Sequence, residues 1–310
     1  MKDTLDLRPM KFRIKGPYGI ILTPFDELGY IRFDAMETQI EKLFEYTGLS
    51  GVVVCGTTSE FIQMSVKENI SVINHCAQYN REGFAVIAGA CASNLGNASA
   101  LAKAAYEAGL PAVLVCPPYY TPLTQEDVAD FYRALADAVE IDIILYNIPT
   151  FTNSISFSTI EKLIEIENFI GVKDSSGNVK EIIGFVSLAQ RKRPDFAVFT
   201  GTDQIILPAL ASGCVGSMTA LSGILPHLNI NIYDAFYRGD LSSALESQMK
   251  TIELLRLAES IVFPAGYKII AEKTGYSTGE ARQVIPKRET VMYTEVDKQI
   301  ENEMKKRGLI

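Results

Sequence analysis

Eight short apolar runs alternate with longer segments of helical periodicity along most of the chain. The runs span residues 19–22, 51–55, 84–88, 112–116, 143–146, 169–172, 197–200 and 213–217. Continuous apolar strands of this kind are typical of a parallel sheet that is covered on both faces. Eight strands, each followed by a helix, predict an α/β fold, the (β/α)8 or TIM barrel. An open, doubly wound sheet is the alternative, but the first run is not followed by a GxGxxG motif.

The segments between the apolar runs have the apolar spacing of amphipathic helices. They span residues 33–46, 66–79, 94–108, 124–139 and 158–167. Several contain, at or near their start, a side chain that can accept a hydrogen bond from a free backbone N–H group, namely Asp34, Ser65, Asn94 and Thr124. We therefore expect helices that begin beside these four residues.

The strand pattern ends near residue 225, and only helical segments follow. Three further helices are predicted, roughly over residues 241–261, 265–274 and 289–306. No Ser/Gly-rich linker or low-complexity segment precedes them. We expect a barrel catalytic domain over residues 1–224, with a lead-in up to about residue 15, and the last barrel helix plus a C-terminal helical extension over residues 225–310.

Composition excludes several classes of protein. The 310 residues carry a net charge of -8, which argues against nucleic acid as the main partner. The five cysteines lack a CxxC pair and the two histidines lie far apart, so neither a disulfide framework nor a metal site is indicated. The chain has no apolar signal-peptide region and no long apolar run for a membrane span, so a reducing cytoplasm is the expected location.

One lysine, Lys173, stands at the end of the sixth apolar run, directly before a turn. Buried lysines are rare unless they are paired or used chemically. An apolar site disfavours the ammonium form, and a neutral amine can attack a ketone to form a Schiff base. The alternative is a lysine at the rim, whose stem packs on the strand while its head reaches water.

Polar residues follow several other runs, at the end of a barrel where active sites lie. Thr57 and Thr58 follow the second run, and their hydroxyls and backbone N–H groups can hold a carboxylate. Tyr146 ends the fifth run and can relay a proton. Asp203 and Gln204 follow the seventh run and can bind substrate hydroxyls. A helix entry with a capping residue is the alternative for both loops.

The loop after the fourth run is rich in proline and tyrosine, reading Pro-Pro-Tyr-Tyr-Thr-Pro over residues 117–122. The prolines hold this loop extended, so it presents Tyr119 and Tyr120 stiffly. The same aromatic pair can fill an interface, and the two interpretations are compatible.

These motifs, taken in order, resemble a known family. The sequence has GTTSE, PPYY, YNIPT, GVKDS and GTDQ at barrel-strand spacing. This pattern resembles the dihydrodipicolinate synthase / N-acetylneuraminate lyase family, and the resemblance runs from about Tyr18 to Lys287. It implies a pyruvate-dependent class I aldolase, a carbon–carbon lyase that needs no metal or other cofactor and whose partners are a 2-oxo acid and an aldehyde.

The resemblance also implies roles for individual residues. Lys173 would form the Schiff base, Tyr146 would shuttle the proton, and Thr57 and Thr58 would hold the pyruvate carboxylate, with Thr57 also linked to Tyr146. Tyr120 would reach across a dimer interface into a neighbouring site, so a homo-oligomer, a homotetramer built as a dimer of dimers, is expected. The expected substrate-binding residues are Thr58, Ser175, Gly201, Asp203, Gln204 and Met218.

The sequence departs from the synthase branch at one informative position. Synthases carry an arginine two residues after the YNxP proline, where this chain has Phe151. Losing the guanidinium removes bidentate recognition of a second carboxylate. Ser175 and Asp203 instead match aldolases that act on 2-keto-3-deoxy sugar acids. Thr219 and Ala220 lie where the sialic-acid lyases have Gly-Ser.

We therefore expect reversible aldol cleavage of a 2-keto-3-deoxy sugar acid, such as 2-keto-3-deoxygluconate, to pyruvate and a hydroxyaldehyde. Other activities on the same scaffold stay open: 4-hydroxy-tetrahydrodipicolinate (dihydrodipicolinate) synthase, 4-hydroxy-2-oxoglutarate aldolase, N-acetylneuraminate lyase or a keto-deoxy sugar acid dehydratase. An inactive barrel that serves as a binding module belongs to a different class. The presence of both Lys173 and Tyr146 argues against it.

Overall fold

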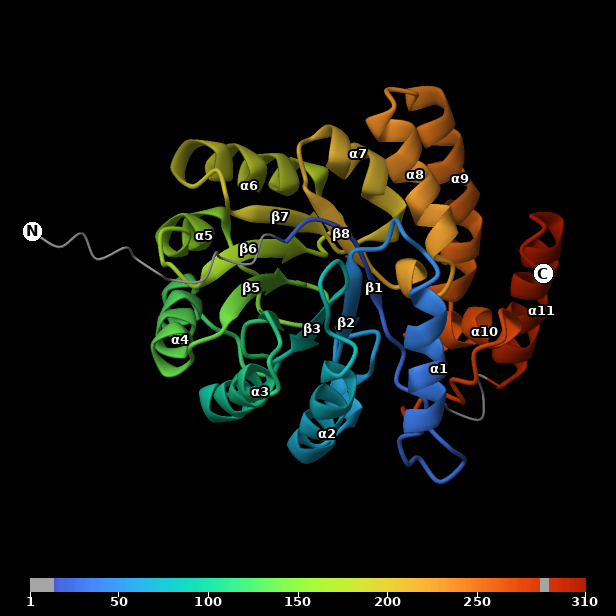
Figure 1. Ribbon diagram of the computed structural model, residues 1–310, viewed down its shortest axis with the longest axis horizontal. Coiled ribbons are helices and arrows are strands. Elements are labelled where there is room, and N and C mark those ends of the chain that lie inside the picture. Colours follow the sequence, from blue (N-terminus) through green and yellow to red (C-terminus); the bar gives the residue numbers. More distant parts are fainter. Residues whose placement is uncertain (1–13, 285–289) are drawn as a thin grey trace, which may run out of the picture.

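The computed structural model describes residues 14–284 and 290–310, and the predicted lead-in lies almost wholly outside them. Eight parallel strands close into a barrel in sequence order, with β1 beside β8 (Figure 1). The strands are β1 Gly16–Ile20, β2 Gly51–Val54, β3 Ala85–Gly89, β4 Ala112–Val115, β5 Asp142–Asn147, β6 Phe169–Asp174, β7 Ala197–Thr200 and β8 Gly216–Thr219. The predicted (β/α)8 barrel is confirmed.

Helices surround this barrel and continue beyond it. They are α1 Phe33–Leu43, α2 Val66–Ala77, α3 Leu95–Glu107, α4 Gln125–Ala138, α5 Phe157–Leu163, α6 Val179–Lys192, α7 Ile206–Ala211, α8 Pro226–Tyr237, α9 Leu241–Ala258, α10 Ala265–Lys273 and α11 Thr290–Lys306. Short 3-10 helices follow three strands: η1 Phe61–Gln63, η2 Asp203–Ile205 and η3 Leu221–Gly223. Among the described residues, no helix combines the length and the apolar character that crossing a membrane requires.

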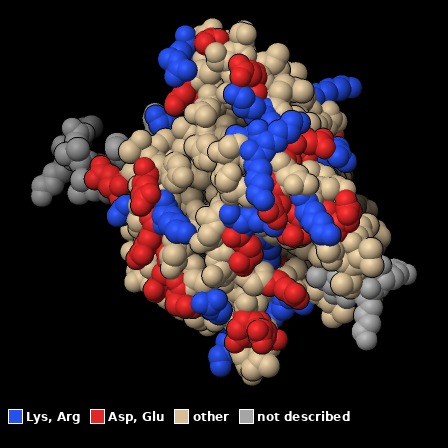
Figure 2. All heavy atoms as spheres, turned by 90° about the vertical axis from the view of Figure 1, so that its right-hand side faces the viewer, with Lys and Arg blue, Asp and Glu red and all other residues tan. Residues whose placement is uncertain are grey.

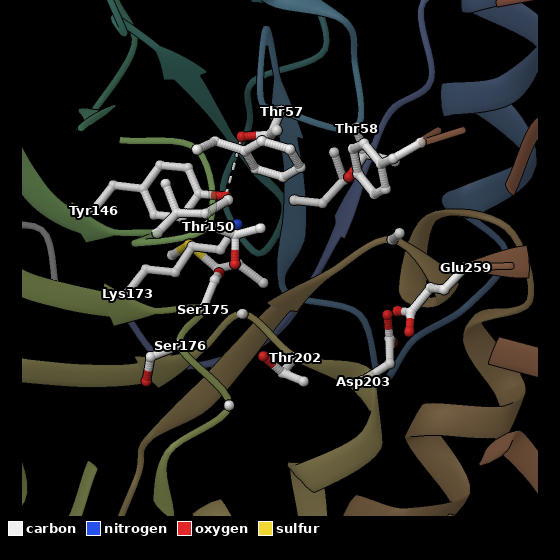
Figure 3. A pocket seen from close by; sticks show the side chains of 18 of the residues that line it. Thr57, Thr58, Tyr146, Thr150, Lys173, Ser175, Ser176, Thr202, Asp203 and Glu259 are labelled. Atoms are coloured by element: carbon white, nitrogen blue, oxygen red, sulfur yellow. Dashed lines mark hydrogen bonds between the residues drawn. The ribbon is translucent and has the colours of Figure 1, made fainter. Parts of the chain in front are cut away.

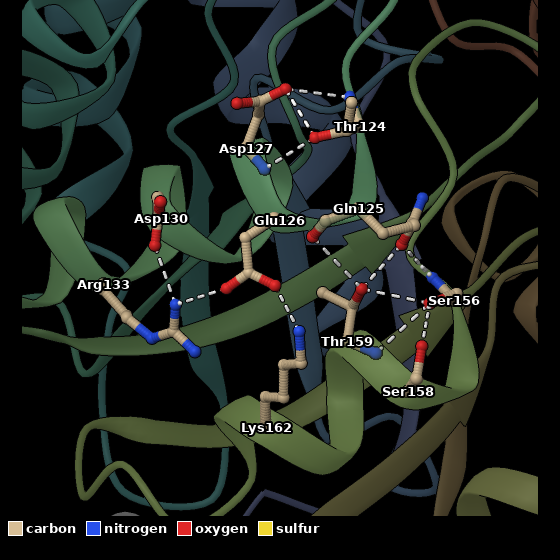
Figure 4. A network of polar contacts seen from close by, with 10 residues as sticks. All are labelled: Thr124, Gln125, Glu126, Asp127, Asp130, Arg133, Ser156, Ser158, Thr159 and Lys162. Carbon is tan, nitrogen blue, oxygen red and sulfur yellow. Dashed lines mark hydrogen bonds and ion pairs between the residues drawn. The ribbon is translucent and has the colours of Figure 1, made fainter.

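Three of the four predicted helix caps are confirmed. The side chains of Ser65, Asn94 and Thr124 each accept a hydrogen bond from a backbone N–H group in the first turn of the following helix (Figure 4 for Thr124). The prediction for Asp34 is wrong, because α1 starts earlier and Arg32 is its N-cap residue. Asp34 lies in the first turn and pairs with Arg32 at 2.9 Å, and a carboxylate there is favoured by the helix dipole.

The first and last strands are shifted from the predicted runs. β1 begins at Gly16 rather than residue 19, and β8 begins at Gly216 rather than residue 213. These two glycines pair where the barrel closes. A Cβ at Gly216 would lie 2.1 Å from the carbonyl oxygen of Gly16, so only glycine permits this approach. Closure between distant strands, rather than local apolarity, therefore sets the two strand ends.

Helix α9 packs against α8, and the C-terminal helices α10 and α11 pack against α9 and against each other (Figure 1). Their buried side chains form one apolar cluster with Leu22 and Leu221, which belong to loops at the barrel strands. Acidic and basic side chains are interspersed on this side of the molecule (Figure 2). The extension therefore packs directly on loops that follow barrel strands.

A buried ion pair ties the extension to the loop after β2. The ammonium of Lys268, on α10, lies 2.8 Å from a carboxylate oxygen of Glu60, and both side chains are almost fully buried. Lys268 also donates to the carbonyl of Thr23 at 3.0 Å. Glu60 has a left-handed backbone (φ 59°), which is unusual for a residue with a side chain. The pair thus holds the turn that carries Thr57 and Thr58.

Candidate active site

A cavity of about 430 Å³ lies among the loops that follow the barrel strands (Figure 3). Nine of the ten residues predicted for the site line it. They are Thr57, Thr58, Tyr146, Lys173, Ser175, Gly201, Asp203, Gln204 and Met218. The loops after strands β2, β5, β6, β7 and β8 all contribute, so the barrel brings together residues that lie far apart in sequence.

Lys173 is buried in the wall of this cavity, with only 4% of its surface exposed. The alternative of a rim lysine with its head in water is therefore wrong. Lys173 on β6 lies opposite Tyr146 on β5 in the pairing of these two strands. The lysine Nζ is 4.3 Å from the centre of the tyrosine ring. Burial lowers the pKa of Lys173 to about 8. A neutral nucleophilic amine is therefore accessible near physiological pH.

Gly201 provides space rather than a binding group. A Cβ at this position would lie 2.5 Å from the Cε of Lys173 and 1.9 Å from the Oγ of Ser175. Any side chain would therefore displace both residues. Glycine at position 201 therefore leaves room for the side chains of Lys173 and Ser175 in the same part of the cavity.

Tyr146 and Thr57 are hydrogen-bonded, with 3.2 Å between their hydroxyl oxygens. This is the link that the family resemblance implied. Burial raises the pKa of Tyr146, while the hydrogen bond with Thr57 lowers it. Because the net direction is upward, the phenol stays protonated at neutral pH and can donate a proton.

Ser59, in the same loop, does not line the cavity. Its hydroxyl donates to the carbonyl of Ile21, and its own carbonyl accepts a hydrogen bond from Thr23 at 2.6 Å. Both contacts attach the loop to the segment that follows β1. The serine therefore holds Thr57 and Thr58 in position through the backbone.

Asp203 and Gln204 line the far part of the cavity, and both already have partners. Asp203 is buried and accepts from the Asn229 amide at 2.8 Å and from the Leu221 N–H at 3.3 Å. The helix-cap alternative is wrong, because Asp203 is the first residue of η2 and no side chain caps that helix. Gln204 donates its amide to Glu259.

Tyr120 is the one predicted site residue that lies outside the cavity. Its side chain is 99% exposed, and its backbone is left-handed with φ at 80°. The neighbouring Tyr119 packs instead against Phe61, with 6.2 Å between ring centres. The entry of Tyr120 into the site of a second subunit stays a prediction, as does the dimer of dimers.

Three lining residues from the helical extension were not predicted. Glu259 follows α9, Phe263 lies between α9 and α10, and Tyr267 is on α10. The ring of Phe263 packs in a tilted arrangement against Phe151, with 5.8 Å between ring centres, and edge-on against Tyr267, with 5.7 Å between ring centres. No local pattern marks these residues, because they do not follow a strand. Thr150 also lines the cavity. Its position directly after the YNIP motif is the sequence signal that could have predicted this.

Side chains that hold metals in other barrels do not gather here. Over residues 14–284 and 290–310, no group of three or more His, Cys, Asp or Glu side chains is arranged to hold a metal ion. The five cysteines are buried and free.

The depressed pKa of Lys173 predicts a pH profile for imine formation with pyruvate. Only the neutral amine attacks, so the initial rate of adduct formation should rise about tenfold per pH unit below about pH 8 and level off above it. Rapid borohydride quenching at a series of pH values, followed by mass spectrometry, measures this rate. A profile that keeps rising to about pH 10, as for an ordinary lysine, would contradict a site that depresses the pKa.

Comparison with known proteins agrees with this architecture. The model of the dihydrodipicolinate synthetase family matches residues 13–303. The 4-hydroxy-tetrahydrodipicolinate synthase of Endomicrobium trichonymphae is 32% identical over 86% of this chain and 90% of its own length. The dihydrodipicolinate synthase structure from Aquifex aeolicus is 28% identical, with a TM-score of 0.85 over 96% of this chain and 99% of that one.

A second type of enzyme is among the similar structures. The 2-keto 3-deoxygluconate aldolase from Picrophilus torridus is 27% identical, with a TM-score of 0.79 over 86% of this chain and 96% of that one. The chain is thus an enzyme, a carbon–carbon lyase of class I, and it belongs to the dihydrodipicolinate synthetase family, whose members use pyruvate and a lysine Schiff base.

Proposed function

We propose that Lys173 forms the Schiff base and that Tyr146 moves the proton. The neutral Nζ attacks the keto carbon of the 2-oxo acid, and water leaves to give a protonated imine. In the cleavage direction, the C3–C4 bond breaks, its electron pair enters the imine as an enamine, and the C4 hydroxyl loses its proton as the aldehyde forms. Protonation of C3 and hydrolysis then release pyruvate and restore Lys173. The hydrogen bond between Tyr146 and Thr57 supports a role for the Tyr146 hydroxyl in exchanging this proton.

For the second substrate, we propose a neutral hydroxyaldehyde derived from a 2-keto-3-deoxy sugar acid. The observation that carries this proposal is the charge of the cavity: of the described residues that line it, Lys173 alone has a basic side chain. Phe151, at the position where the family resemblance places the arginine of synthases, also lines the cavity. Two carboxylates, Asp203 and Glu259, line the remaining wall together with hydroxyl groups, and a carboxylate accepts a hydrogen bond from a hydroxyl but repels another carboxylate.

The synthase activity is the second candidate, and the comparisons support it better than the sugar-acid activity. The curated relatives with similarity over most of the chain are mainly named 4-hydroxy-tetrahydrodipicolinate synthase. A sugar-acid aldolase is represented by the Picrophilus torridus structure. The charge of the cavity and the names of the relatives thus point to different aldehydes, and the aldehyde must be measured.

A screen of aldehydes with pyruvate tests the proposal directly. We expect kcat/KM for glyceraldehyde to exceed that for aspartate semialdehyde and glyoxylate by at least about tenfold, because an unpaired carboxylate costs binding energy in a cavity without a guanidinium. N-acetylmannosamine, which is neutral, is included to test the sialic-acid lyase activity. Product formation is followed by mass spectrometry, and cleavage of 2-keto-3-deoxygluconate is measured in the reverse direction. A preference for aspartate semialdehyde would overturn the proposal and establish the synthase activity instead.

A further inference from the structure

Glu259 introduces a negative charge into the cavity from outside the barrel. It follows the last residue of α9 and lines the same cavity as Lys173. Figure 3 shows its carboxylate turned toward that of Asp203. Burial is the main cause of the raised pKa of Asp203. The nearby charge of Glu259 raises it further, so the two acids interact.

Neutral donors hold this carboxylate in place. The amide nitrogen of Gln204 lies 2.8 Å from each of its oxygens, and the hydroxyl of Tyr267 donates to Oε1 at 2.9 Å. Tyr267 is buried, so its ring fixes the position of this bond. Among the described residues, no Lys or Arg forms an ion pair with Glu259. Its charge is therefore oriented but not neutralised.

A carboxylate offers about four acceptor positions, and the contacts with Gln204 and Tyr267 leave capacity for another donor. A substrate hydroxyl can use that capacity. A substrate carboxylate has no hydrogen to donate, and it would meet two acids with no cation beside them. Glu259 thus favours a substrate that ends in a hydroxyl and disfavours one that ends in a carboxylate.

We propose that Glu259 is a specificity-determining residue, which accepts a hydrogen bond from the terminal hydroxyl of the aldehyde and repels aldehydes that end in a carboxylate. This inference rests on the proposed hydroxyaldehyde activity. A structural role is the competing explanation, in which Glu259 only holds Gln204 and Tyr267 together. The substitution Glu259→Gln separates the two, because an amide retains an acceptor for Tyr267 while it removes the charge.

The test uses two aldehydes that differ only in the terminal group farthest from the aldehyde carbon. Glyceraldehyde ends in CH2OH, and tartronate semialdehyde has a carboxylate in its place. With pyruvate, wild-type enzyme should favour glyceraldehyde in kcat/KM. In Glu259→Gln, the ratio of the two kcat/KM values should shift about fivefold toward tartronate semialdehyde, a modest change because Glu259 is exposed to solvent at the cavity.

Salt dependence gives a readout that a purely structural role would not change. Raising the ionic strength from about 0.05 to about 0.5 M should weaken the discrimination by wild-type enzyme, since it screens the repulsion. It should have a smaller effect on Glu259→Gln, in which Asp203 is the one remaining acid of the two. Glu246→Gln is the matched control, because Glu246 lies on α9, the helix that Glu259 follows, and pairs with Lys250 outside the cavity. The control should keep the wild-type ratio and its salt dependence.

Two failures can be told apart. If wild-type enzyme favours glyceraldehyde but Glu259→Gln leaves the ratio and its salt dependence unchanged, with pyruvate trapping at Lys173 intact, the assignment of Glu259 is overturned. If wild-type enzyme traps pyruvate but fails to turn over glyceraldehyde, the proposed hydroxyaldehyde activity fails, and the assignment falls with it.

Discussion

Replacing Lys173 with methionine is expected to abolish the pyruvate adduct and to lower kcat by at least about 10³-fold, because no other lysine among the described residues lines the cavity. Methionine is unbranched and fills the buried space left by the lysine stem. It also removes an amine whose charged form is disfavoured by burial, so the fold should keep its stability. Borohydride trapping with mass spectrometry, steady-state kinetics and thermal unfolding measure these three results.

A second lysine provides the control for this experiment. Lys180 lies on α6, directly after the loop that follows Lys173, and is exposed to solvent. Lys180→Met should trap pyruvate and turn over as wild-type enzyme does. A trapped adduct that persists in Lys173→Met, at any other lysine, would contradict the assignment of the nucleophile. Loss of the adduct in both Lys173→Met and Lys180→Met would mean that trapping depends on the number of positive charges near the site and not on Lys173 itself.

The barrel was predictable because its signal is local and repeats. Each strand is a short apolar run, and the helices have their own periodicity. Three of them also begin at a side-chain cap that could be predicted, at Ser65, Asn94 or Thr124. The site was predictable for the same reason, since residues at strand ends must converge in a closed barrel. Lys173 and Tyr146 even pair in register on β6 and β5.

The parts that escaped prediction depend on contacts between distant segments. Gln204 meets Glu259 across 55 positions of sequence, and no periodicity indicates this pairing. The ion pair of Lys268 with Glu60 links α10 to the β2 loop in the same way. The sequence pattern of α9 indicates the apolar face of the helix. It does not indicate that Glu259, which follows the helix, lines a cavity. Tyr120 is the opposite case, because its predicted role needs a second chain.

Tyr146→Phe is expected to separate imine formation from turnover. Adduct formation with pyruvate should survive, because Lys173 keeps its buried surroundings and the ring beside it. The catalytic rate kcat should fall by about 10²- to 10³-fold, since the phenol that exchanges the substrate proton is gone and Thr57 loses its partner. Single-turnover trapping and steady-state kinetics distinguish the two steps.

A buried tyrosine elsewhere shows whether that loss is specific. Tyr132 is fully buried and donates to the Val115 carbonyl at 2.8 Å, outside the cavity. Tyr132→Phe should cost about 1 kcal/mol of stability while leaving kcat unchanged. Turnover by Tyr146→Phe at the wild-type rate would remove Tyr146 from the mechanism. Loss of trapping in Tyr146→Phe would instead mean that its hydroxyl is needed to form the imine, because the same proton can assist the departure of water from the carbinolamine.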